Sequence, residues 1–178
     1  MSDNTHIEWS DATWNPIWAR NRDGLPNITN GGWACVRVSL GCEHCYAETI
    51  NQRLGTGLDY TVGGMAQGEP YLDEGALMQP LHWRKSRRIF AGSMTDLFGP
   101  WVRWEWLDRI FAVAALAKFH TLLFLTKRPE LGRAYLCDPG TRGRIADLVA
   151  TWPVVPEMLR DDLARSIRGE EGTAHGPW

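Results

Sequence analysis

The sequence predicts an α/β fold built on about three parallel strands with helices between them. Short apolar runs ending in small polar residues alternate with stretches of helical period, as in RRIFAGSM, WVRWEWLDRIFAVAALAKF and HTLLFLTKRPE. This alternation is typical of βαβ units and a parallel sheet. Because three strands do not close a barrel, we expect either an open parallel sheet or a partial parallel (β/α) barrel. We favour the second, as the N-terminal part of a larger barrel.

The strands are expected at 7–14, 89–91 and 121–125, where short apolar runs are bounded by turn-forming or polar residues. Helices are expected where apolar residues recur every three or four positions, or where the composition is helical. The helical stretches are 45–54, 73–78, 101–119, 129–137, 142–152 and 156–169. The glycine-rich stretch 55–70 is expected to be a loop.

Length and charge narrow the class of protein. The 178 residues fit a single domain, 1–178, which we expect to be truncated, with a loop insertion at about 17–33 and a helical segment at about 141–170. A net charge of −2 argues against a protein that coats duplex DNA. No apolar run is long enough for a membrane span and the N-terminus does not resemble a signal peptide, so we expect a cytoplasmic protein without a membrane partner.

Three of the four cysteines are clustered in the sequence. Cys35, Cys42 and Cys45 are spaced C-x6-C-x2-C on a glycine-containing loop just before a predicted helix, whereas Cys137 stands alone and is expected to be a small half-buried thiol. Soft anionic sulfur holds iron and zinc well, and the two-residue gap lets two thiolates face one centre. The cluster therefore predicts a metal centre rather than a disulfide framework.

Three interpretations of this loop stay open. In a structural zinc site a fourth ligand completes the tetrahedron, and His44 or His6 is available in the sequence. In a 4Fe–4S cluster held by three cysteines, the fourth iron is open to a substrate or cofactor. The third interpretation is three buried thiols without a ligand. The absence of a fourth nearby cysteine favours the cluster.

Polar residues follow both of the later strands. In parallel α/β folds, ligands gather at the carboxyl ends of the strands. An Asp can accept a hydrogen bond from a hydroxyl or amine, and a Lys–Arg pair suits an anion. Alternatively, the Asp caps a turn and the basic pair lies in a solvated loop. These candidate cofactor-binding residues are Ser93, Thr95, Asp96, Thr126, Lys127 and Arg128.

A basic run precedes the second strand. Arg84, Lys85, Arg87 and Arg88 follow Trp83, a combination that could contact a nucleic-acid phosphate backbone. With a negative net charge, the simpler interpretation is a solvated segment that leads into the strand.

Four strings in the sequence are specific enough to suggest a family: WSDATWNP, C-x6-GC-x2-CYAE, IFAGSMTDLF and LLFLTKRPE. Together they resemble a phage-associated family of unknown function, named after two phage gene products, over about 6–136. The resemblance implies further strands beyond those seen here, so this copy would be inactive or completed by another chain. It also implies a partner protein associated with a three-cysteine motif.

The loop also resembles the NP-x-x-GC…C-x2-CYA signature of some radical S-adenosylmethionine enzymes, although the first gap is six residues where that superfamily usually has three. The resemblance implies that Cys35, Cys42 and Cys45 hold a 4Fe–4S cluster. Its open iron would bind S-adenosylmethionine, and reductive cleavage would give a 5′-deoxyadenosyl radical. His44 would lie against the adenine, and Tyr46 of the CYAE string would belong to the same cofactor site.

The leading hypothesis is therefore an iron–sulfur protein of a radical S-adenosylmethionine-like family, acting on an unknown substrate, nucleic acid or other. The alternative is a non-catalytic zinc module that acts as a partner protein in a phage or mobile-element system.

Overall fold

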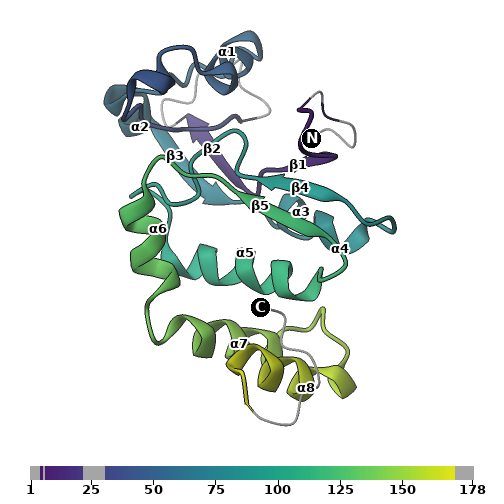
Figure 1. The fold of residues 1–178 in the computed structure, drawn as a ribbon. Helices are drawn as coiled ribbons and strands as arrows, with labels where there is room; N and C mark the ends of the chain where they lie inside the picture. The colour runs from purple at the N-terminus through teal and green to yellow at the C-terminus, as the bar shows by residue number, and fades with distance from the viewer. Residues whose placement is uncertain (1–4, 6, 22–30, 171–178) are drawn as a thin grey trace.

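A three-stranded parallel sheet lies at the centre of the protein (Figure 1). In the computed structural model, which describes residues 5, 7–21 and 31–170, the sheet contains β1 (Ala12–Trp14), β4 (Arg88–Ala91) and β5 (Thr121–Phe124) in the order β1-β4-β5. Ala91 is in register with both Trp14 and Phe124, so the three strands end together. The predicted parallel α/β architecture is confirmed; the described strands do not form a closed barrel.

The strands form where the chain can bury apolar side chains on one face of the sheet. Ala12, Trp14, Ile89 and Ala91, which share that face, are all essentially inaccessible to solvent. The first strand is shorter than the predicted 7–14, because the chain turns before it, with the N–H of Ser10 bonded to the carbonyl of Ile7. The other two strands lie within one residue of the expected bounds.

Helices α5, α7 and α8 form layers on one side of the sheet (Figure 1). Helix α5 (Trp104–Leu116) buries its apolar stripe in the central core. Helix α7 (Thr141–Thr151) packs against α5, and α8 (Glu157–Arg168) packs against α7. Helix α6 (Pro129–Leu136) follows β5, with Pro129 in its first turn. All four helices were expected from the sequence. None of the helices in the described ranges is both long and apolar enough to cross a membrane.

Two predicted loops prove to contain regular structure. The stretch 55–70 includes α2 (Val62–Gln67), which is capped by the Thr61 side chain, and the first residues of β3 (Gly68–Leu72). Strand β3 pairs antiparallel with β2 (Ile17–Asn21), which lies in the segment predicted as a loop insertion, 17–33. The prediction was wrong because burial of Ile17 and Ala19 on one face, with long-range pairing, outweighs the local preference of glycine for turns.

The remaining helices are short. A 3₁₀ turn, η1 (Leu40–Cys42), is followed by α1 (Tyr46–Arg53), with Cys45 immediately before its first residue. The predicted helix at 73–78 is α3 (Glu74–Leu77), capped by Asp73, and α4 (Gln79–His82) follows it. His6 and residues 22–30 of the predicted insertion lie outside the described residues.

Candidate functional site

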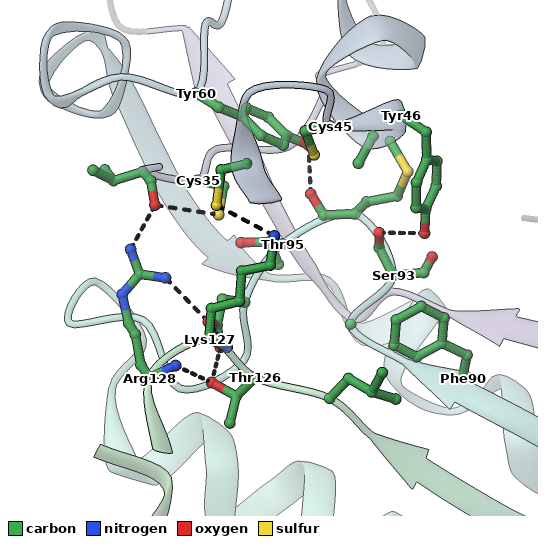
Figure 2. A pocket seen from close by; sticks show the side chains of 17 residues that line it. Cys35, Cys45, Tyr46, Tyr60, Phe90, Ser93, Thr95, Thr126, Lys127 and Arg128 are labelled. Atoms are coloured by element: carbon green, nitrogen blue, oxygen red, sulfur yellow. Dashed lines mark hydrogen bonds and ion pairs between the residues drawn. The ribbon is translucent and has the colours of Figure 1, made fainter. Parts of the chain in front are cut away.

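Cys35, Cys42 and Cys45 line one cavity of about 370 Å³ at the carboxyl ends of β4 and β5. The loops that follow the two strands form the other side of the cavity, and Figure 2 shows Cys35 and Cys45 on the side opposite Thr126 and Lys127. None of the three cysteines is in a disulfide. The fold therefore brings the cysteine loop to the edge of the sheet where the sequence placed the other candidate residues.

Most of the sequence-predicted residues meet in this cavity. His44 is exposed and is not part of the lining. His6 lies outside the described residues. Cys137, predicted to be half-buried, is instead exposed at the end of α6. The candidates that line the cavity are Tyr46, Ser93, Thr95, Asp96, Thr126, Lys127 and Arg128.

Thr95 and Arg128 hold the backbone on both sides of Cys35. The Thr95 hydroxyl donates to the carbonyl of Ala34 at 2.6 Å, and Arg128 Nη2 donates to the carbonyl of Val36 at 2.6 Å. Both donors are buried. Because the two bonds come from the ends of different strands, they fix the first cysteine relative to the sheet.

The carboxylate of Asp96 joins the two strand-end loops. Its Oδ1 accepts from the N–H of Phe98 at 3.0 Å and from the hydroxyl of Thr126 at 2.7 Å. Its Oδ2 accepts from the N–H of Lys127 at 3.1 Å and from Arg128 Nη1 at 3.0 Å. Four donors match the acceptor capacity of a carboxylate. In this structure Asp96 therefore positions the site, which includes the turn-capping role considered above.

Two residues that the sequence did not single out secure the other side of the cysteine loop. The side chain of Asn51, fully buried on α1, bonds both the N–H and the carbonyl of Trp33 and also the carbonyl of Leu58. Glu48, one turn earlier, accepts from Arg37 and from the N–H of Tyr60. Their i, i+3 spacing on a predicted helix was the available signal, because two polar residues on one helix face can both turn inward.

The chemical environments of the cysteines differ. Burial raises the pKa of the Cys35 thiol, and the N–H of Asp96 offsets this only in part. For Cys42, burial acts in the same direction, but hydrogen bonds from the backbone of Val38 and Ser39, the Ser39 hydroxyl and Lys127 outweigh it and lower the pKa to about 7. Of these two thiols, Cys42 therefore becomes a thiolate, the form that binds metals, at the lower pH.

Two aromatic side chains complete the wall beside the cysteines (Figure 2). The hydroxyl of Tyr60 donates to the carbonyl of Met94, and that of Tyr46 donates to the carbonyl of Ser93 at 2.9 Å. Burial strongly raises the pKa of Tyr60, so its phenol stays neutral. Tyr46, adjacent to Cys45, lines the cavity, whereas His44, which the resemblance placed against the adenine, does not.

The side chains do not form a ready-made metal site. Among residues 5, 7–21 and 31–170, no three His, Cys, Asp or Glu side chains are grouped closely enough to hold a metal ion. The three cysteines share the lining of one cavity without forming such a group.

The basic run lies at the opposite end of β4 from the cavity. Arg88 is paired with Asp11 at 2.9 Å, and the Arg87 guanidinium lies over the ring of Trp83 at 5.0 Å from its centroid. These contacts hold the side chains of Arg87 and Arg88 against neighbouring residues of the protein itself. The run therefore does not contribute to the cysteine cavity.

The parallel sheet and the cysteine-lined cavity define an α/β protein with a candidate metal centre at its strand ends. Its sequence from residue 4 to residue 158 matches the family described as "Protein of unknown function (DUF5131)", and the chain belongs to that family. No curated protein matches the chain. No solved structure matches it either.

Proposed function

We propose that this protein binds a 4Fe–4S cluster through Cys35, Cys42 and Cys45 and belongs to a radical S-adenosylmethionine-like class of enzymes. The observation that carries the proposal is the lining of one cavity by all three cysteines at the carboxyl ends of two parallel strands. Three thiolates leave one iron of such a cluster open. When bound, the cluster would supply the electron for reductive cleavage of S-adenosylmethionine.

The protein's own side chains would prepare this centre. Thr95 and Arg128 hold the backbone around Cys35, and Asn51 holds the segment that precedes it. Two buried apolar side chains of the wall, Phe90 and Met94, would limit access of water to a reactive species. Tyr46 offers a ring to a planar group such as adenine.

We also infer that the sheet is part of a (β/α) barrel. Two observations support the inference. The three parallel strands lie in the sheet in the same order as in the sequence, with α5 between β4 and β5, and a cavity lies at the carboxyl ends of β4 and β5. Within the described part of the chain, β5 has a strand partner on one side only. Its other side would accept the next strand of a barrel.

Anaerobic reconstitution with iron and sulfide tests the cluster. We expect a brown protein with about four iron and four sulfide per chain. Replacing Cys35, Cys42 or Cys45 by Ser should abolish or sharply reduce iron binding, whereas Cys137→Ser, at an exposed position outside the cavity, is the matched control and should keep it. A colourless protein with a single bound zinc would overturn the proposal in favour of the zinc module.

The enzyme class needs a second experiment. With the cluster loaded, a strong one-electron reductant and S-adenosylmethionine, we expect 5′-deoxyadenosine to form, as measured by chromatography. A loaded cluster without this product would restrict the function to iron–sulfur binding.

A further inference from the structure

The ammonium group of Lys127 directly contacts the cysteine loop. Its Nζ lies 3.4 Å from Cys42 Sγ and donates to the carbonyl oxygen of Gly41 at 2.9 Å. Figure 2 shows the Lys127 side chain extending from the strand-end loop toward the cysteines. The contact joins residues 85 positions apart in the sequence, so only the fold creates it.

The charge of Lys127 is not neutralised by a carboxylate. The neighbouring Arg128 is paired with Asp96 at 3.0 Å, but Lys127 makes no ion pair with any Asp or Glu among the described residues. Lys127 and Arg128 are the cationic side chains that line the cavity. Lys127, the cation without a carboxylate partner, is thus the one that contacts a cysteine sulfur.

The backbone fixes where this charge lies. Lys127 follows β5 by three residues, and its N–H is held by Asp96 Oδ2 at 3.1 Å. The Gly41 carbonyl holds the other end of the side chain. A lysine held at both ends keeps its charge near one sulfur instead of distributing it over many rotamers.

We propose that Lys127 compensates negative charge at the Cys42 corner of the cluster and thereby raises the reduction potential of the cluster; this rests on the proposed function. Three thiolates around a [4Fe–4S]²⁺ core carry a net negative charge. Uptake of one electron from a low-potential one-electron donor gives [4Fe–4S]⁺ and makes that charge more negative. A cation beside a ligating sulfur stabilises the reduced form more than the oxidised form, especially in a partly water-excluded cavity.

The test is a redox titration of the cluster-loaded protein, followed by electron paramagnetic resonance. Lys127→Met should shift the midpoint potential to a more negative value, Lys127→Gln should do so by a smaller amount, and Lys127→Arg should stay near the unaltered protein. Lys85→Met removes a charge from an exposed position before β4 and is the matched control, expected to leave the potential unchanged.

The outcomes separate this inference from the proposed function. Equal potentials for Lys127→Met and the unaltered protein, with the cluster loaded in both, would overturn the role of Lys127 and leave the cluster standing. An unaltered protein that takes up no iron and sulfide would overturn both. A folded Lys127→Met protein that fails to load iron, with loading restored by Lys127→Arg, would support charge compensation through cluster assembly.

Discussion

The carboxylate of Asp96 and the guanidinium of Arg128 form an ion pair with 3.0 Å between Oδ2 and Nη1, and their side chains are only 8% and 10% exposed. Arg128 also donates to the carbonyl of Val36 and lies over the ring of Trp101, 4.7 Å from its centroid. One buried pair therefore connects the end of β4, the end of β5 and the residue after Cys35. The shape of the candidate metal centre depends on this connection.

Removing one member of this pair should be costly. Asp96→Ala leaves the Arg128 charge buried without a partner, and we expect the free energy of unfolding to fall by about 3 kcal/mol, as measured by urea denaturation. Asp11→Ala is the matched control, because its ion pair with Arg88 is exposed and should matter much less. Equal losses in the two variants would contradict a special role for the buried pair.

Cys42 should be more reactive than Cys35 in protein without a metal. Since the pKa of Cys42 is lowered to about 7 and that of Cys35 is raised by burial, iodoacetamide should label Cys42 faster than Cys35, with a rate that rises as the pH passes through about 7. Lys127→Met removes one of the groups that favour the thiolate and should move this rise to higher pH. Peptide mass spectrometry measures the labelling. Faster labelling of Cys35 than of Cys42 at neutral pH would contradict the assignment.

Asn51 should be required for both stability and iron binding. Asn51→Leu keeps the approximate volume but leaves three backbone groups of Trp33 and Leu58 without their partner, which should cost about 3 kcal/mol. We also expect a lower iron content after reconstitution, because Trp33 lies two residues before Cys35. Gln52→Ala, at the adjacent exposed position, is the control for both measurements.

His120 should make the protein less stable in acid. Burial lowers its pKa, mildly opposed by the bond between Nε2 and the carbonyl of Pro80, so the folded protein resists protonation at this site. As the pH falls below 6.5, the ordinary value, the unfolded chain takes up a proton that the folded chain does not, and the free energy of unfolding decreases.

The variant His120→Gln checks this assignment. Thermal denaturation as a function of pH should show a weaker decline below pH 6.5 in His120→Gln than in the unaltered protein. His82→Gln, at an exposed position, is the matched control. An unchanged decline in His120→Gln would assign the acid sensitivity to other groups.

Several parts of the fold follow from local sequence. The strand at Arg88–Ala91 is a short apolar run flanked by polar residues, and α5 has an apolar residue at nearly every position of one face. Such periodicities are decided by which side of an element must be buried, so they are visible without tertiary contacts. Strand β2 was missed because its partner, Gly68–Leu72, is far away in the sequence: the closest pair, Asn21 and Gly68, is 47 positions apart, farther than any local pattern reaches. The partner also begins in a glycine-rich stretch that resembles a loop.

The roles of the strand-end residues could not be assigned in the same way. A sequence that places Asp96 after one strand and Arg128 after another predicts that both lie at the same edge of the sheet. It does not predict whether they face a ligand or each other. Whether the two side chains form their 3.0 Å ion pair depends on how the surrounding side chains pack, and the spacing of residues in the sequence does not encode that packing.

By itself, the sequence determined the alternation of strands and helices, the parallel sheet and the three cysteines that share one loop, because each is recorded in local periodicity or spacing. Only the tertiary structure decided that Lys127 touches Cys42, that Asn51 and Thr95 hold the loop, and that His44 is exposed outside the cavity. The contacts of Lys127, Asn51 and Thr95 join segments separated in the sequence, and they require the packing of apolar side chains that places those segments side by side.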